Sequence, residues 1–201
     1  MKIAILVEGK TEMAFKPHLT AFLAGRLEGR MPRLDMFRYD GRIPKGDDLR
    51  RKVENLLSGR QPSDAVIALT DVYTGTDDFV DAADAKAKMR RWVGPNPSFH
   101  PHVAQHDFEA WLLPYWDEIQ KLARHIRKAP AAAPETVDHK HPPSYHLQEI
   151  FRVGTGRDYY SKVRDANRIL RNKDLAIAAA QCPELKAFLN RILTLSGGTP
   201  I

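Results

Sequence analysis

Cysteine and long apolar runs are scarce in this sequence. Its 201 residues include one cysteine, Cys182, so no internal disulfide is expected. The apolar runs at 3–7 and 65–69 are about strand length, far short of the roughly 20 apolar residues that a membrane helix requires. The sequence therefore predicts no membrane-spanning segment.

Export signals and repeats are also missing. The first residues, MKIAILVEG, contain neither a charged leader nor an apolar run long enough for export. No similarity recurs at the periods typical of solenoids or propellers. A chain of 201 residues can bury a core of its own as one domain. We therefore expect a soluble, single-domain, cytoplasmic protein.

Acidic residues are fewer than basic ones, and the formal net charge is +6. Residues 119–175 alone contain 12 Lys/Arg and 6 Asp/Glu, an excess equal to that of the whole chain. Such a basic region suits a phosphate polymer, because Lys and Arg release the counterions condensed on it. Solvated helix faces would give the same charge balance, so this feature favours nucleic acid without deciding it.

Short apolar runs alternate with segments of helical spacing along most of the chain. The strand-like runs lie at 2–7, 34–39, 64–70 and 99–105, and the helical segments at 11–27, 47–57, 77–92 and around 111–119. This alternation predicts an α/β fold in which helices flank a mostly parallel sheet of about four strands. Pro17 should kink the first helix or delay its start.

Proline and alanine dominate residues 129–143, which show no periodicity and are expected to form a loop. The predicted organisation is therefore an α/β core at 1–128, the loop at 129–143 and a helical segment at 144–201. We expect the helical segment to complete the same domain.

Carboxylates follow three of the predicted strands: Glu8, Asp71 and Glu109. In an open α/β sheet these strand ends face one crevice, where carboxylates repel one another unless a cation joins them. Hard oxygen ligands suit Mg²⁺ or Mn²⁺, and such an ion can promote phosphodiester hydrolysis. A single acid at such a position more often caps a helix or begins a turn, but three at matching positions favour a metal site.

The segment VEGKTE at 7–12 resembles the first motif of Toprim domains, which occur in OLD-type nucleases, RloB-like proteins and small uncharacterised relatives. In those families the motif is followed by an Asp after a later strand, a Phe-Glu-Ala segment and a Tyr-x-Lys. The matching residues here are Asp71, Phe108-Glu109-Ala110 and Tyr160-Ser161-Lys162. The resemblance covers residues 2 to about 170 and implies a Toprim-like (Rossmann-like) fold.

The resemblance also implies a nuclease that cuts DNA or RNA with Mg²⁺ or Mn²⁺. Glu8 would be a metal ligand or general acid/base, Asp71 and Glu109 would be metal ligands, and Glu12 would be an outer or second-metal ligand. Lys162 would contact phosphate and complete the catalytic set with Glu8, Asp71 and Glu109.

Lys10 is a second candidate, beside Lys162, for contact with nucleic acid. OLD-type and RloB-like proteins are associated with ATPases and with prokaryotic defence against phage. The resemblance therefore implies an ATPase partner protein and a role as a subunit of an anti-phage system. A homo-oligomer is compatible with it.

One position departs from the family pattern: Asp-x-Asp is replaced by Asp71-Val72-Tyr73, which puts a second metal in question. Asp77 or Asp78 would have to substitute, although acids there more often cap helices. The alternative hypothesis is a non-catalytic subunit with a vestigial metal site that binds nucleic acid or a partner. A phosphohydrolase acting on nucleotides or small phosphoesters is a third hypothesis.

Overall fold

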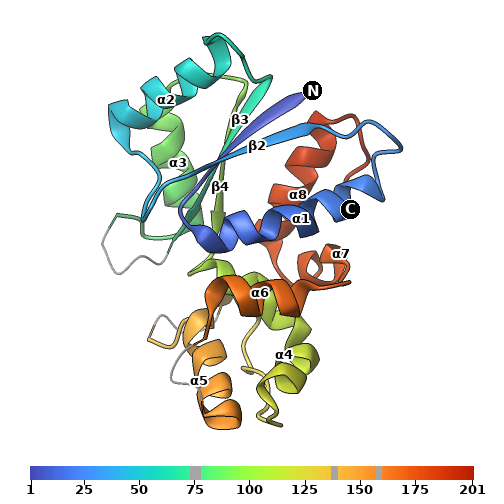
Figure 1. The fold of residues 1–201 in the computed structure, drawn as a ribbon. Coiled ribbons are helices and arrows are strands. Elements are labelled where there is room, and N and C mark those ends of the chain that lie inside the picture. The colour runs from blue at the N-terminus through green and yellow to red at the C-terminus, as the bar shows by residue number, and fades with distance from the viewer. Residues whose placement is uncertain (73–77, 137–139, 157–159) are drawn as a thin grey trace.

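A parallel β-sheet forms the centre of the molecule (Figure 1). The computed structural model describes residues 1–72, 78–136, 140–156 and 160–201. Within these residues the sheet has four strands in the order β2-β1-β3-β4, all parallel. The strands are β1 (Lys2–Val7), β2 (Arg33–Arg38), β3 (Ala65–Asp71) and β4 (Phe99–Ala104). The predicted α/β fold with a sheet of about four strands is confirmed.

Helices cover both faces of this sheet and its carboxyl edge. The α-helices are α1 (Lys10–Ala24), α2 (Gly46–Ser58), α3 (Ala82–Val93), α4 (Trp116–Ala123), α5 (Pro143–Thr155), α6 (Lys162–Leu170), α7 (Leu175–Ala179) and α8 (Pro183–Leu195). The 3₁₀ helices are η1 (Phe108–Tyr115) and η2 (Pro134–Thr136). In the described ranges, every helix is too short or too polar to cross a membrane.

Strand β1 shows why the faces need two helical layers. Its side chains alternate between two apolar clusters: Ile3 and Ile5 belong to the cluster that contains residues of α1 and α8. Ala4 and Leu6 belong to the cluster that contains residues of α2 and α3. A strand that is buried on both sides must be apolar at consecutive positions, which accounts for its continuous apolar sequence.

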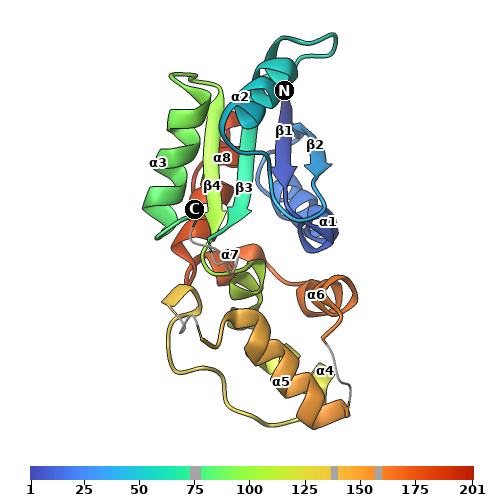
Figure 2. The same ribbon diagram turned by 90° about the vertical axis from the view of Figure 1, so that its left-hand side faces the viewer.

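Helices α4, α5 and α6 lie beyond the carboxyl ends of the strands (Figures 1 and 2). Helix α6 packs against α1, while α4 and α5 pack against each other and against η1. These helices come from the second half of the chain, yet they stand beyond the ends of β1 and β3, which belong to its first half. The second half therefore covers the edge at which the predicted site lies.

Two predicted helix starts differ from the observed ones. Helix α1 includes Pro17 but begins at Lys10, so the proline does not delay it. The helix expected from residue 77 begins only at Ala82, because the Asp81 side chain accepts a hydrogen bond from the Asp84 N–H (2.8 Å) and caps it there.

Proline accounts for two further differences. The helix expected around 111–119 is divided into η1, which contains Pro114, and α4, which begins at Trp116. The expected loop at 129–143 contains η2, and α5 already begins at Pro143, since proline suits the first position of a helix.

The contact of α5 with α4 gives a test of this arrangement. A Cβ added at Gly154 would collide with the Ala123 carbonyl oxygen and lie 2.7 Å from the His125 Cβ. Alanine normally stabilises a helix by about 1 kcal/mol relative to glycine, but this clash should reverse the sign and cost about 1–3 kcal/mol. Urea unfolding of Gly154→Ala would measure the change. Val153→Ala, at the exposed neighbouring position, should stay within about 0.5 kcal/mol of the parent; a Gly154→Ala protein at least as stable as the parent would contradict the packing.

Candidate active site

A pocket of about 540 Å³ lies at the carboxyl edge of the sheet. Its lining brings together all the predicted site residues, namely Glu8, Lys10, Glu12, Asp71, Glu109 and Lys162. They come from the β1–α1 turn, the start of α1, the end of β3, η1 and the start of α6. Because β1 and β3 are adjacent and parallel, Glu8 and Asp71 emerge at the same edge.

Glu8 is buried in the turn between β1 and α1. Its Oε1 accepts a short hydrogen bond from the hydroxyl of Thr70, in the adjacent strand β3. Burial raises the pKa of Glu8 to about 7; the Thr70 hydrogen bond opposes this shift and the Glu12 carboxylate adds to it. Near neutral pH this carboxyl group therefore exists in both the protonated and the charged form.

Glu12 also fixes the turn at the start of α1. Its Oε2 accepts a hydrogen bond from the Gly9 N–H (3.1 Å), as the third residue of a helix commonly does. A Cβ at Gly9 would lie 3.3 Å from the same oxygen, so glycine gives this oxygen room. Burial raises the pKa of Glu12, and backbone N–H groups and the Lys162 ammonium oppose the rise. One carboxylate oxygen of Glu12 thus stabilises the turn at the start of α1.

Asp71 and Glu109 also have carboxyl groups with raised pKa values. Burial, followed by the charges of Glu8 and Glu12, raises the pKa of Asp71 well above its usual range. Glu109 is 1% exposed, and burial together with the Asp107 carboxylate raises its pKa to about 7. The pKa of each carboxyl group is raised because burial removes water from the charged form and because neighbouring carboxylates repel it.

Lys162 supplies positive charge to this acidic pocket. Its Nζ lies 3.5 Å from Oε1 of Glu109. Burial lowers the pKa of Lys162, but the neighbouring carboxylates, Glu109 first, outweigh it and the pKa is raised. The turn before α6 is anchored by Asp165, which is fully buried and accepts a hydrogen bond from the Ser161 N–H (2.9 Å). Lys162 is therefore a protonated cation held at a fixed turn.

Asp107 is a buried acid that the sequence prediction did not include. Its Oδ2 accepts a hydrogen bond from the Ser144 N–H at the start of α5 (3.1 Å). Its charge contributes to the raised pKa values of Asp71 and Glu109. The signal was present in the sequence, because Asp107 follows β4 by three residues, much as Glu8 follows β1. The Phe-Glu-Ala match drew attention to Glu109 instead.

The chemistry of these oxygens fits a hard cation. Among the described residues, the buried Oδ1 of Asp107 accepts no hydrogen bond, which is costly unless another group satisfies it. The buried Oε1 of Glu109 also accepts none, but it lies 3.5 Å from the Lys162 ammonium. Carboxylate oxygens are the ligands that Mg²⁺ and Mn²⁺ prefer. Among the described residues, however, no three His, Cys, Asp or Glu side chains are already gathered as a metal-binding group. Binding would therefore draw the carboxylates closer together.

The structure argues against Asp78 as a replacement for the missing second aspartate. Its carboxylate pairs with Arg42 and, at 2.5 Å, with the ammonium of Lys45, and it does not line the pocket. Tyr73 and Asp77 lie outside the described residues. Asp40, which sequence reasoning did not select, does line the pocket, and no local pattern in the sequence marks it.

A family model described as "Domain of unknown function (DUF4276)" matches residues 7–193. The chain belongs to this family. The structure is similar to the C-terminal region of the Burkholderia pseudomallei OLD protein, with a TM-score of 0.55 and 13% identity over 97% of this chain and 98% of that one. For the C-terminal region of the Xanthomonas campestris pv. campestris OLD protein, the TM-score is 0.48 and the identity 16%, over 97% of this chain and 95% of that one. No curated protein matches the sequence.

At this level of identity, the likeness to the Burkholderia pseudomallei structure concerns the fold. It agrees with the α/β architecture and extends along nearly the whole length of both chains. The family match encloses the pocket residues from Glu8 to Lys162. The pocket thus belongs to the part of this DUF4276 protein that defines the family.

The crowding of carboxylates predicts an unusual mutational effect. Asp71→Asn removes a charge from the centre of the pocket and should raise the midpoint of thermal unfolding by a few degrees at pH 8 in EDTA, because ionised neighbours no longer repel it. Asp64→Asn is the matched control at the other end of β3, where the carboxylate accepts a hydrogen bond from the Lys2 N–H, and it should not stabilise the protein. Calorimetry of both variants would check this; a destabilised Asp71→Asn protein would contradict net repulsion at the site.

Proposed function

We propose that this chain is a Toprim-type nuclease that hydrolyses phosphodiester bonds of DNA or RNA with Mg²⁺ or Mn²⁺. The observation that carries the proposal is the convergence of Glu8, Asp71, Glu109 and Lys162, from four separate segments, on one pocket. Buried acids with perturbed pKa values beside a cation, in a pocket at strand ends, are typical of catalytic sites.

Glu8, Asp71 and Glu109 would hold the divalent ion, with Asp107 as a further oxygen donor beside Glu109. A bound ion would supply Lewis acidity at the phosphoryl group and lower the pKa of a coordinated water. The buried Oδ1 of Asp107, which accepts no hydrogen bond from the described residues, supports this donor set.

The chain's own residues account for the remaining needs of the reaction. The Lys162 ammonium, kept protonated by its neighbours, would bind a phosphate oxygen and offset charge that develops on it. If Asp71 and Glu109 hold the ion without Glu8, the Glu8 carboxyl group, with a pKa of about 7, would instead accept or return a proton near neutral pH. The Thr70 hydroxyl holds the Glu8 carboxyl in one orientation. Lys10, exposed at the start of α1, would contact the nucleic-acid backbone together with the helix N-terminus.

We also propose that the protein acts in the cytoplasm with an ATPase partner, as a subunit of an anti-phage system. Assembly into a homo-oligomer is compatible with this role. Support comes from the resemblance of VEGKTE and the downstream motifs to OLD-type and RloB-like proteins. The similar solved structure is itself described as the C-terminal region of an OLD protein, a part of a longer chain, which agrees with a division of labour between this fold and other domains.

The alternative proposal is a non-catalytic subunit that binds nucleic acid or a partner. It is favoured by the lack of a gathered metal-binding group among the described residues and by Tyr73 at the position of the second aspartate. This alternative predicts binding of nucleic acid in EDTA with a steep dependence on salt and no cleavage products with Mn²⁺.

The deciding experiment is cleavage of single- and double-stranded DNA and RNA with Mg²⁺, Mn²⁺ or EDTA. We expect metal-dependent fragments from the parent protein, and a loss of at least about 100-fold in rate for Glu8→Gln and Glu109→Gln, because each removes a charged ligand. Lys162→Ala should also slow cleavage, and Lys162→Arg should restore part of it.

Glu54→Gln, on the exposed face of α2, is the matched control and should cut at the parental rate. Circular dichroism would verify that each variant folds. Cleavage by Glu8→Gln at the parental rate would refute the assigned site. A lack of products with every substrate and metal, combined with salt-sensitive binding in EDTA, would favour the non-catalytic subunit.

A further inference from the structure

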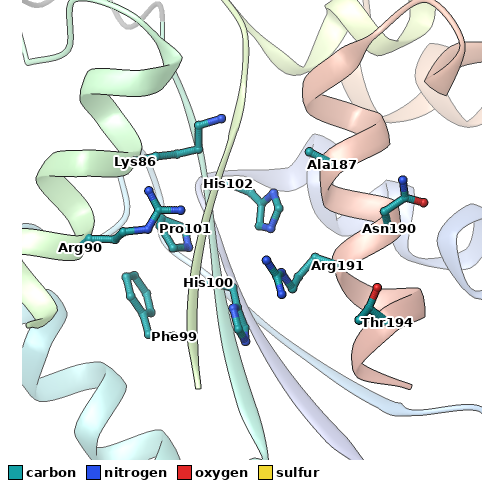
Figure 3. Close-up of a pocket in the computed structure, with 10 residues that line it drawn as sticks. All are labelled: Lys86, Arg90, Phe99, His100, Pro101, His102, Ala187, Asn190, Arg191 and Thr194. Atoms are coloured by element: carbon teal, nitrogen blue, oxygen red, sulfur yellow. The ribbon is translucent and has the colours of Figure 1, made fainter. Parts of the chain in front are cut away.

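A second pocket, of about 530 Å³, lies along β4 between α3 and α8 (Figure 3). It is separate from the acidic pocket, with which it shares no lining residue. Its charged lining is basic: Lys86 and Arg90 come from α3 and Arg191 from α8. No aspartate or glutamate belongs to the described lining. Its charge is therefore opposite to that of the acidic pocket.

Strand β4 is the last strand of the sheet, so its outer edge has no neighbouring strand in the described residues. Pro101 in this strand has no N–H to offer another strand, which protects the edge against strand addition. Figure 3 shows the rings of His100 and His102 on the same side as Arg191, whereas Arg90 approaches from α3. The pocket thus wraps around an edge that is open to a small ligand but unsuited to a strand.

The two arginines of this pocket, Arg90 and Arg191, differ from Lys86 in their partners. Among the described residues no ion pair involves the guanidinium of Arg90 or Arg191, whereas Lys86 pairs with Glu184 at 2.7 Å. Their charges reach the same ring: burial and then Arg191 and Arg90 lower the pKa of His100 to about 4. Uncompensated cations around neutral rings leave the pocket with excess positive charge.

The histidines carry unused hydrogen-bonding atoms. His102 is 7% exposed, and its ring contacts Phe188 of α8 at 5.7 Å between centroids. Its Nδ1 is buried and has no hydrogen-bond partner in the part of the chain that the structure describes, and the same holds for Nε2 of His100. Burial and Arg191 lower the pKa of His102 to about 3, so the ring is neutral, and a neutral imidazole can donate from one nitrogen. A buried polar atom without a partner is costly, which points to a missing ligand.

We propose that this pocket binds an oxyanion of the phosphate class, held by Arg90 and Arg191 and hydrogen-bonded by His102. Guanidinium groups match phosphate oxygens with paired donors, and the anion offsets the repulsion between the two arginines. The volume is in the range of small-molecule sites, so the phosphate belongs either to a nucleotide or to a nucleic-acid backbone. The site needs no metal and no residue of the acidic pocket, and it stands whether or not the chain is a nuclease.

Calorimetric titration with inorganic phosphate in EDTA tests the proposal. We expect saturable binding by the parent protein and a loss of at least about tenfold in affinity for Arg191→Gln and for Arg90→Gln. Arg91→Gln is the matched control, since Arg91 follows Arg90 in α3 but does not line the pocket, and it should bind as the parent does. NMR of the histidine rings should show phosphate-dependent shifts of His102 that Arg191→Gln abolishes.

Competition then identifies the source of the phosphate. Displacement of phosphate by AMP but not by a single-stranded oligonucleotide would assign a nucleotide; displacement by the oligonucleotide, weakened by Arg191→Gln, would assign a nucleic-acid backbone. The proposal is overturned if the parent shows no saturable phosphate binding. It is also overturned if Arg91→Gln loses as much affinity as the other variants, or if an acidic peptide binds where no phosphate compound does.

Discussion

Mutual repulsion among carboxylates withdrawn from water is the constraint on which the rest of this structure depends. Glu8, Asp71 and Glu109 meet at the carboxyl edge of the sheet, and burial and neighbouring charges raise the pKa of each. The protein offsets part of this cost by placing the Lys162 ammonium beside Glu109 and the Thr70 hydroxyl on Glu8. The repulsion that remains is confined to the acidic pocket. Such unfavourable contacts are common where a fold holds functional groups ready for a ligand.

The second half of the chain makes this arrangement possible. Helices α4, α5 and α6 cover the carboxyl edge of the sheet and keep water from groups that would otherwise be solvated. They also contribute polar contacts, because the N–H of Ser144 binds Asp107 and the start of α6 presents Lys162. Closing the edge and supplying the cation are thus two results of the same packing, with α6 against α1.

Charge is divided between two places in the molecule. The acidic pocket lies beyond the strand ends, and the basic pocket lies along the outer edge of β4. The basic pocket does not draw on the basic region at 119–175 that the sequence emphasised; Lys86, Arg90 and Arg191 all lie outside it. The net charge of that region therefore did not mark this pocket, because its side chains are brought together by packing rather than by order in the sequence.

The sequence by itself determined the alternation of strands and helices and the position of Glu8 and Asp71, because an apolar run ends where the chain leaves the sheet and parallel strands all leave at one edge. It did not determine the capping by Asp81, the division at Pro114, or the role of Glu12 in the turn at Gly9. Only the tertiary structure decided that the Asp107 carboxylate lies close enough to raise the pKa of Glu109 and that α3, β4 and α8 share a basic pocket. Burial and pairing arise from contacts between segments far apart in sequence, whereas periodicity reports only on near neighbours.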